Sequence, residues 1–253
     1  MIDLGDGIAL VAPGGAYISS ERALIVADLH AGYVQTLQRR GFTLPAQGDD
    51  ALLSRMRAML SHIDATRVVV AGDLVHGRPA FAAREGSRSP LDRLLDALDG
   101  RALTVVPGNH DRGSSDLLTR RGVEVSESCA IGPHMVMHGD EGTDRLRGER
   151  SLAITRGGRL VLGHIHPALS LDDGAGARAR VPAFARAPGL LCLPAMAPLA
   201  RGADLMRDDH AEELTELATA REISVTVIVG AQVIEVGVLA KVRAARRAAR
   251  DAG

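Results

Sequence analysis

The sequence is poor in aromatic residues and in cysteine. Its 253 residues include no tryptophan, two tyrosines and three phenylalanines, which together make 2% of the chain. A platform of aromatic rings for stacking unpaired bases is therefore poorly supplied. Cys129 and Cys192 lie in separate apolar stretches, so neither a disulfide framework nor a CxxC metal site is indicated. Both are expected to be buried free thiols.

Excess charge and long apolar runs are lacking as well. Lys plus Arg number 30 against 31 Asp plus Glu, so the net charge of -1 gives no global attraction for nucleic acid or acidic membranes. No apolar run approaches the roughly 18 residues of a spanning helix, and the N-terminus is acidic where a signal peptide is basic. We expect a cytoplasmic protein with no membrane partner, folded as one domain over residues 1–253.

Short β-branched runs that end in Asp, Asn or His recur along the chain. They predict strands within residues 23–30, 67–76, 102–110, 135–141 and 159–166. Helices predicted over 49–63 and 90–100 separate the first three strands, which favours parallel pairing and an α/β fold. In such sheets ligands bind beyond the carboxyl ends of the strands, where these polar residues lie.

Three segments complete the prediction of local structure. Residues 223–238 predict two strands of a hairpin that turns at Gly230 and Ala231. Residues 172–188, rich in Gly, Ala, Pro and Arg, form the most loop-like segment of the chain. The C-terminal residues 241–253 predict a basic helix, with a solvated face or a partner contact favoured over catalysis.

The polar residues at the strand ends are metal-ligand types. Two pairs each flank a single residue, so each pair is expected to point to one face of an extended strand end. Glycines precede Asp73 and Asn109, which lets the backbone come close to what these side chains bind. The seven candidate donors are Asp28, His30, Asp73, Asn109, His138, His164 and His166.

Seven donors exceed the three or four that hold a single catalytic ion. They suit two ions about 3.5–4 Å apart, bridged by a carboxylate and a water. Imidazole, carboxylate and amide donors together fit Mn²⁺, Fe or Zn²⁺, of which we favour Mn²⁺. Each motif alone can be explained by local structure without a metal, since Asp-x-His can cap a helix and Gly-Asp is a common turn. Together, in this order and all at strand ends, they indicate a two-metal hydrolase.

The ordered motifs DLH, GDLVH, GNHD, HGD and GHIH, which span residues 28–166, resemble the signature of the calcineurin-like metallophosphoesterase superfamily. The resemblance implies a four-layer α/β/β/α sandwich with two mixed sheets and a dinuclear site at one edge. It also implies which side chains hold each ion. One ion would bind Asp28, His30, Asp73 and His166, and the other would bind Asp73, Asn109, His138 and His164, with Asp73 as the bridge.

The resemblance further implies hydrolysis of a phosphodiester by a water that bridges the ions. His110 is the candidate proton donor to the leaving oxygen, and we expect Asp111 to hold its ring and favour the protonated form. His76 is similar to the last histidine of the GDxFH element in the DNA-repair nuclease branch of the superfamily. There that histidine lies beside the metals and helps to position the phosphodiester.

A closer resemblance is to the ligase-associated DNA damage response endonucleases, through DLHAG, GDLVH and an LPA motif within residues 189–205. It implies DNA as the substrate, with a DNA ligase and a helicase as repair partners. Two arginine-bearing loops are expected to border the site, either as phosphate contacts or as solvated residues. The arginines are Arg78, Arg84 and Arg88 in one loop and Arg178, Arg180 and Arg186 in the other.

Two alternatives from other functional classes stay open. One is a phosphodiesterase for small substrates such as cyclic nucleotides, which would use the same metals without contacts to a long strand. The other is a non-catalytic scaffold that keeps the fold as an interaction platform. The presence of all seven donors and of His110 argues against the scaffold.

Overall fold

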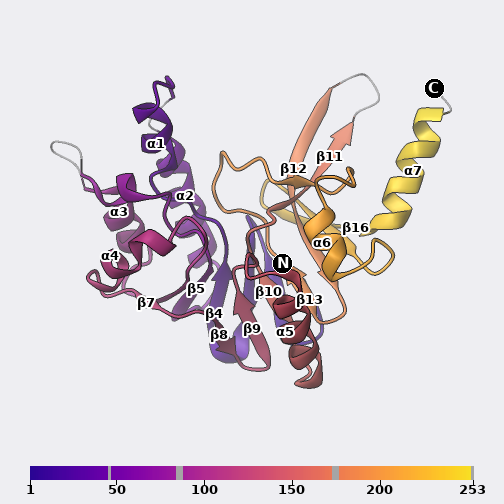
Figure 1. Cartoon of the computed structure of the whole chain (residues 1–253), viewed down its shortest axis with the longest axis horizontal. Coiled ribbons are helices and arrows are strands. Elements are labelled where there is room, and N and C mark those ends of the chain that lie inside the picture. Colours follow the sequence, from indigo (N-terminus) through magenta and orange to yellow (C-terminus); the bar gives the residue numbers. More distant parts are fainter. Residues whose placement is uncertain (45–46, 84–87, 173–176, 252–253) are drawn as a thin grey trace.

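The computed structural model, which describes residues 1–44, 47–83, 88–172 and 177–251, has four layers (Figure 1). Two mixed sheets pack face to face at the centre, and helices cover the outer face of each. Three separate clusters of buried apolar side chains fill the spaces between the layers. The predicted α/β/β/α sandwich with two mixed sheets is confirmed.

The first sheet combines an antiparallel half and a parallel half. Its strands follow chain order: β1 (Ile2–Asp3), β2 (Ile8–Val11), β3 (Gly15–Ile18), β4 (Ala23–Val26), β5 (Arg67–Ala71), β6 (Ala102–Val106) and β7 (Glu124–Val125). The strands from β4 onward are parallel, as predicted, because helices connect them. These helices are α1 (Tyr33–Arg39), α2 (Gln47–Leu60), α3 (Pro90–Ala97) and α4 (Ser115–Thr119).

The second sheet is built from the later strands in a rearranged order. That order is β14 (Ala203–Asp204), β11 (Pro167–Asp172), β12 (Arg178–Ala187), β13 (Leu190–Cys192), β10 (Leu160–Leu162), β9 (His134–Met137) and β8 (Cys129–Ile131). The expected hairpin is present as β15 (Ser224–Val229) and β16 (Gln232–Val238), and β15 also pairs with β12. The outer helices are α5 (Thr143–Thr155), α6 (Glu212–Leu217) and α7 (Leu239–Asp251).

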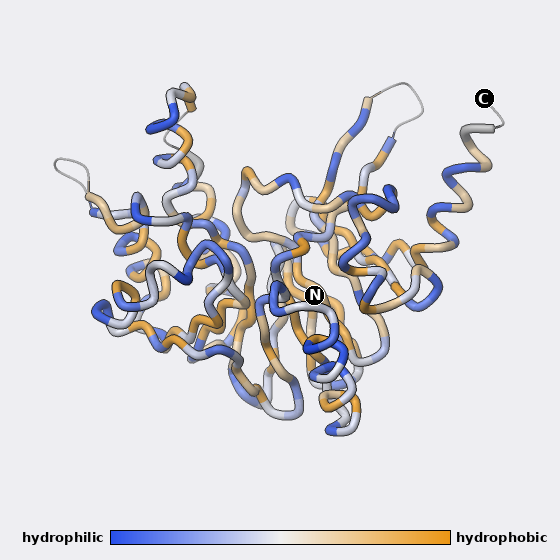
Figure 2. Tube along the Cα trace, viewed as in Figure 1, coloured by the Kyte–Doolittle hydropathy of each residue, from blue (hydrophilic) through white to orange (hydrophobic). Residues whose placement is uncertain are grey.

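Both faces of the central strands are buried, which explains their continuous apolar runs. In β4, Leu24 and Val26 pack toward the outer helices, whereas Ile25 packs against the other sheet. In β10, Leu160 and Val161 divide in the same manner between the outer and the inner cluster. Because side chains alternate between the two faces of a strand, each central strand contributes residues to an outer cluster and to the inner cluster. Figure 2 shows the hydrophobic colour in these strands.

The segment 172–188, expected to be a loop, is instead mostly strand. Residues 173–176 lie outside the described residues, but β11 and β12 pair as an antiparallel hairpin on either side of them. The loop was predicted from the composition of the segment, whereas the burial of each residue depends on where it lies along β12. Ala183, Phe184 and Ala185 are buried where β12 pairs with β15, and Ala185 also pairs with β13. This tertiary pairing outweighs the Gly, Ala and Pro content.

Other expectations hold. Cys129 and Cys192 are buried and unbonded to one another. The basic C-terminal helix is present as α7 as far as Asp251, the last described residue. No helix among the described residues has the length and apolar character that crossing a membrane requires.

Phe184 is the largest of the fully buried side chains, and it lies in the cluster between the two sheets. We predict that Phe184→Ala lowers the free energy of unfolding by about 3–5 kcal/mol, because the lost ring leaves a cavity where the sheets meet. Urea denaturation measures this change. The matched control is Phe42→Ala at a side chain that is 59% exposed, which should shift stability by no more than about 0.5 kcal/mol. Equal losses in both variants would contradict the prediction.

Candidate metal centre

The candidate donors occupy loops that begin where β4, β5, β6, β9 and β10 end. The strands are shorter than the sequence suggested, because the backbone leaves the extended conformation as the polar residues begin. The loops after β4 and β5 nevertheless stay joined. The amides of Asp28 and His30 donate to the carbonyls of Gly72 (3.0 Å) and Asp73 (2.8 Å), and the amide of His76 donates to Ala31 (2.8 Å). Neighbouring loops thus form one hydrogen-bonded edge.

Left-handed backbone is concentrated at this edge. Seven non-glycine residues among those described have positive φ, and five of them are candidate donors. A single such residue is uncommon and costs free energy, and a cluster of them at one place points to a function. The Asp-x-His and His-x-His pairs were expected in extended strand ends, and that expectation is wrong. The five residues and their φ values are Asp28 (55°), His30 (47°), Asp73 (52°), His164 (60°) and His166 (49°).

Three glycines that precede donors are required by close packing. A Cβ at Gly72 would overlap the ring of His138, and one at Gly108 would overlap the carboxylate of Asp73. A Cβ at Gly163 would lie 2.9 Å from Oδ2 of Asp28, which is too close for a real contact. Each glycine therefore makes room for a donor that comes from another strand, a role that the sequence did not indicate.

The first group of donors is held together around Asp28. Ligand atoms of Asp28, His30 and His166 all lie within 4.8 Å of one another. Nε2 of His166 is 3.1 Å from Oδ1 of Asp28, and Nε2 of His30 is 3.8 Å from Oδ2 of Asp73. The structure thus brings together the four side chains that were assigned to one ion.

The second group meets at His138, whose ring is fully buried. Its Nδ1 lies 3.1 Å from the carbonyl oxygen of Ala71, which only accepts, so the ring proton belongs on Nδ1. The lone pair of Nε2 then faces Oδ1 of Asn109 at 3.2 Å and Oδ2 of Asp73 at 3.7 Å. Two oxygens beside the lone pair of Nε2 are unfavourable alone and become favourable around a cation, so the donor set fits a metal ion.

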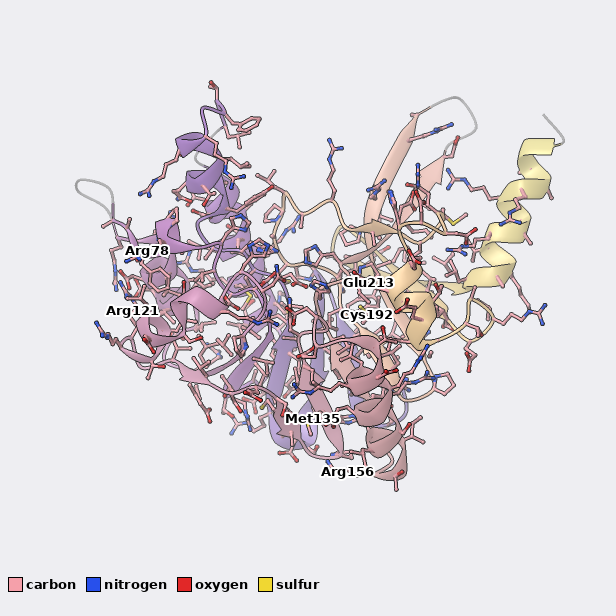
Figure 3. The ribbon with its side chains drawn as sticks, in the orientation of Figure 1. Arg78, Arg121, Met135, Arg156, Cys192 and Glu213 are labelled. Atoms are coloured by element: carbon pink, nitrogen blue, oxygen red, sulfur yellow. The ribbon has the colours of Figure 1, made fainter. Side chains whose placement is uncertain are left out.

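His164 is placed differently from the other donors. Its ring packs edge-on against His138, with centroids 4.9 Å apart, while its Nε2 lies 3.7 Å from the Glu213 carboxylate of α6. Among the described residues it joins no group of three acidic, histidine or cysteine donors. Its role as a ligand stays a prediction. Glu213, labelled in Figure 3, was not anticipated, because the acidic run of its helix gives no sign of a link to GHIH.

Burial shapes the proton affinities of this cluster. It raises the pKa of the Asp73 carboxyl to about 7, against the opposing effect of His138. It lowers the pKa of His30 to about 2, helped by repulsion from neighbouring histidines. Burial is the largest influence on His166 and disfavours its charged form, but the hydrogen bond to Asp28 and the negative charges of Asp28 and Asp73 together outweigh burial and raise the pKa of His166. Buried carboxylates and neutral imidazoles are what a divalent cation binds.

His76 and His110 lie beside these donors. Nδ1 of His76 is 3.3 Å from Nδ1 of His30, and the rings of His76 and His110 stack with centroids 4.4 Å apart. Burial lowers the pKa of His76 to about 4 and also lowers the pKa of His110. The ring of Tyr33 packs against His76 at 4.5 Å, a contact that no motif in the sequence indicated. His110 is exposed, so its ring can reach a bound ligand.

Asp111 does not orient the His110 ring, and that expectation is wrong. Its carboxylate is fully buried and accepts backbone N–H bonds from Leu74 (3.1 Å), Val75 (2.9 Å) and Gly108 (3.1 Å). Both oxygens are therefore committed to the backbone, and no hydrogen bond among the described residues joins them to the His110 ring. Asp111 ties the loop after β5 to the loop after β6. The amide of His110, in turn, donates to Oδ1 of Asp73 at 2.9 Å.

The two arginine-bearing loops are only partly as expected. Arg84 lies outside the described residues, and Arg88 is paired with Asp96 at 2.6 Å. Arg178, Arg180 and Arg186 belong to strand β12 rather than to a loop. Arg186 is paired with Glu235 at 2.8 Å, whereas Arg178 and Arg180 line a cavity that also contacts His166. Arg78 lies in a short 3-10 helix, Arg78–Phe81.

Comparisons with known proteins agree with this geometry. Residues 21–167 match the family model described as calcineurin-like phosphoesterase. No curated protein matches the chain significantly. Among solved structures, the chain is similar to Pseudomonas putida nuclease MPE, with 22% identity and a TM-score of 0.66, over 93% of this chain and 98% of that one. It is also similar, with 15% identity and a TM-score of 0.39, to the Aquifex aeolicus protein of unknown function AQ665, over 61% of this chain and 82% of that one.

The matched region is more than half of the chain, and it holds every candidate donor from Asp28 to His166. The likeness to the first of the two structures supports the same fold. The chain therefore belongs to the calcineurin-like phosphoesterase family and is a metal-dependent phosphoesterase.

Proposed function

We propose that this chain hydrolyses phosphodiester bonds in nucleic acid, with DNA as the substrate, and that it uses two divalent ions. The observation that supports it most is the meeting of acceptor atoms from Asp73, Asn109 and His138 without a donor between them. The Pseudomonas putida protein that shares the fold is a nuclease by name, which supports a nucleic-acid substrate.

Two overlapping sets of side chains would hold the ions. Mn²⁺ is the favoured metal, with Fe or Zn²⁺ as alternatives, because the donors are oxygen and imidazole nitrogen. When bound, two such ions polarise phosphoryl oxygens and lower the pKa of a water between them. Asp28, His30, Asp73 and His166 would hold one ion, and Asp73, Asn109, His138 and His164 the other.

The side chains near the donors would handle substrate and protons. His110 is exposed at the edge of the cluster, and its ring can donate a proton to the leaving oxygen. Burial lowers the pKa of His110 in the free protein, but a bound phosphodiester is negative and would raise it again. His76, stacked on His110, would help to position the phosphodiester. Asp111 would act only by holding the two loops in register.

We predict that Asp73→Asn removes most bound metal and lowers hydrolysis of bis-p-nitrophenyl phosphate by about 100-fold or more. Even groups that only support metal ligands contribute about 10- to 100-fold, and Asp73 would contact both ions. Metal analysis and initial rates with Mn²⁺ check this. The control is Asp64→Asn, at a side chain that is 79% exposed, which should keep both metal and rate. Full metal content in Asp73→Asn would contradict the assignment of the bridge.

We predict that His110→Ala keeps its metal but loses about 100-fold or more in turnover, because a proton donor contributes about 10²–10⁴-fold. The measurements are bound Mn²⁺ and kcat on a phosphodiester. His62→Ala, at an exposed histidine that follows α2, is the matched control and should behave as the unaltered protein. Metal loss in His110→Ala would make His110 a ligand instead.

The substrate class is tested by parallel assays of the unaltered protein with Mn²⁺. The substrates are single-stranded DNA, duplex DNA, cyclic nucleotides and bis-p-nitrophenyl phosphate. Cleavage of DNA supports the proposal. Hydrolysis of cyclic nucleotides without cleavage of DNA would favour the small-substrate phosphodiesterase, and no hydrolysis at all would favour a scaffold. Repair partners, a DNA ligase and a helicase, belong to the same proposal, and their genes beside this one would support it.

A further inference from the structure

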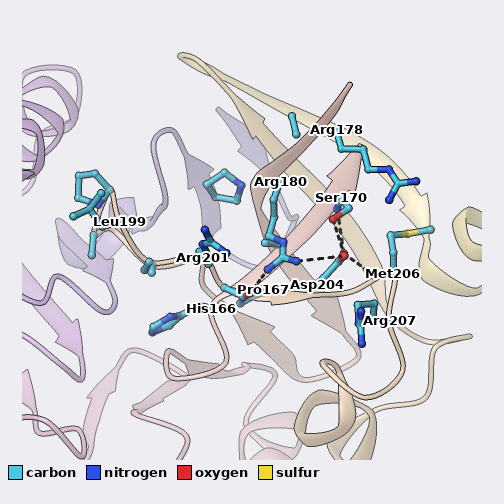
Figure 4. Close-up of a pocket in the computed structure, with 18 of the residues that line it drawn as sticks. His166, Pro167, Ser170, Arg178, Arg180, Leu199, Arg201, Asp204, Met206 and Arg207 are labelled. Atoms are coloured by element: carbon cyan, nitrogen blue, oxygen red, sulfur yellow. Dashed lines mark hydrogen bonds and ion pairs between the residues drawn. The ribbon is translucent and has the colours of Figure 1, made fainter. Parts of the chain in front are cut away.

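A cavity of about 920 Å³ opens beside the metal centre, on the side of the second sheet. His166 lines it at the metal centre, and its wall continues over strands β11 and β12, the loop of residues 197–202 and helix α7 (Figure 4). Among the described residues that line it, eight are arginines and one, Asp204, is a carboxylate. This local excess of positive charge stands out in a chain whose net charge is only -1.

We propose that this cavity binds the sugar–phosphate backbone of a nucleic-acid strand next to the scissile bond, and that it does so without reading the bases. The inference rests on the proposed function and deepens it, because it assigns the path that a polymeric substrate takes away from the metal centre.

Four of the arginines have no carboxylate partner in the part of the chain that the structure describes. Arg201 and Arg247 are exposed, and neither makes a side-chain hydrogen bond or ion pair with any described residue. Arg55 of α2 donates to the carbonyl of Met196 at 3.1 Å, and Arg246 of α7 donates to the carbonyl of Ser170 at 3.3 Å. A carbonyl orients a guanidinium but leaves its charge unneutralised, so all four remain available to phosphates.

The single carboxylate in the wall does not cancel this charge. Asp204 is buried and accepts bonds from the amides of Ser170 and Met206, each at 3.1 Å, and from the Ser170 hydroxyl at 2.6 Å. Arg180 lies 3.8 Å from Asp204 and also donates to the carbonyl of Gly202 at 3.2 Å. Asp204 therefore fixes the floor of the cavity and the position of Arg180 (Figure 4).

The remaining three arginines are paired with carboxylates outside the lining. Arg178 contacts Asp172 at 3.3 Å, Arg207 contacts Asp209 at 2.6 Å, and Arg243 pairs with Asp208. These pairs neutralise part of the wall and leave the excess on Arg55, Arg201, Arg246 and Arg247. The four come from α2, from the loop of residues 197–202 and from α7, so the charge is spread along the cavity rather than gathered at one point.

The spacing and the chemistry of the wall favour a polymer over a small phosphoester. One phosphate needs one or two arginines, whereas a strand carries a charge at every nucleotide. The described lining residues include no Trp, Tyr or Phe, so they offer no such ring on which a base could stack. Contacts to phosphates alone position a strand and carry no sequence information. These features favour a path for the sugar–phosphate backbone of the nucleic acid that begins at His166.

The test is a double variant, Arg201→Ala with Arg247→Ala, chosen because neither side chain supports the fold. Anisotropy of a labelled, phosphorothioate-linked single-stranded DNA, which resists cleavage, gives Kd for the Mn²⁺-loaded protein from about 50 to 200 mM salt. We expect weaker binding and a salt slope of log K that is shallower by about 1.4, since each phosphate contact to a single strand contributes about 0.7. The same difference should persist in EDTA.

Two matched variants separate charge from other effects. Arg156→Ala removes an exposed arginine at the C-terminal end of α5 and should leave the salt slope unchanged. Arg156, labelled in Figure 3, lies at the opposite end of the view from β11, β12 and α7, which Figure 1 labels and which line the cavity. Arg201→Lys with Arg247→Lys keeps both charges and should restore the slope. A parallel fall in the thermal midpoint of the Ala double variant would indicate a structural role and overturn the proposal.

Other outcomes decide the matter as well. An unchanged salt slope in the Ala double variant would overturn the proposal, as would binding of poly-glutamate as tight as that of the strand, which would indicate an acidic protein partner. The proposed function fails differently, through absence of hydrolysis in the unaltered protein. If the salt slope is unchanged in the Ala double variant while the unaltered protein cleaves DNA, the proposed binding of the strand in the cavity is rejected and the proposed nuclease function is retained.

Discussion

Repulsion between acceptor atoms at the metal centre is the constraint on which the rest of the structure depends. Oδ2 of Asp73 and Oδ1 of Asn109 both lie near Nε2 of the buried His138, at the edge where the two sheets meet. Such a group disperses unless its backbone is fixed or a cation lies among its members. The five left-handed donor residues cost on the order of 1 kcal/mol or more each. Their sum is a large part of a typical net stability of about 5–15 kcal/mol.

The surrounding frame offsets that cost in two ways. The three apolar clusters of the four-layer sandwich stabilise the fold. Hydrogen bonds between the loops then hold the donor residues in place. Asp111 is central here, because one buried carboxylate gathers amides from two loops and so sets where Asp73 and His110 stand. A cation bound to the folded state and not to the unfolded chain would add further stability by mass action. The donors of the metal centre are thus held in place by their surroundings, whereas Arg201 and Arg247 of the neighbouring cavity are exposed.

The sequence predicted the strands and the polar residues at their ends well, because both depend on local pattern. The four-layer sandwich followed from the resemblance to the family. Apolar runs that stop at DLH, GDLVH or GNHD specify where buried strands end and which side chains meet there. The sequence failed where the partner is distant. Asp111 stands beside His110 in the chain, but the amides that satisfy it belong to Leu74 and Val75. The composition of β12 indicated a loop, and its pairing with β11, β13 and β15 makes it a strand.

Because Tyr33 contacts His76 and the chain has few other aromatic residues, the intrinsic fluorescence of the chain reports in part on this region. With no tryptophan, the near-ultraviolet emission of the chain comes from two tyrosines. Tyr17 donates to the carbonyl of Asp64 at 2.9 Å, whereas Tyr33 lies against the histidine cluster. One native fluorophore therefore stands at the metal centre, and the other stands apart from it and adds a constant background at the same wavelengths. A change around the Tyr33 ring therefore alters part of the emission of the unlabelled protein.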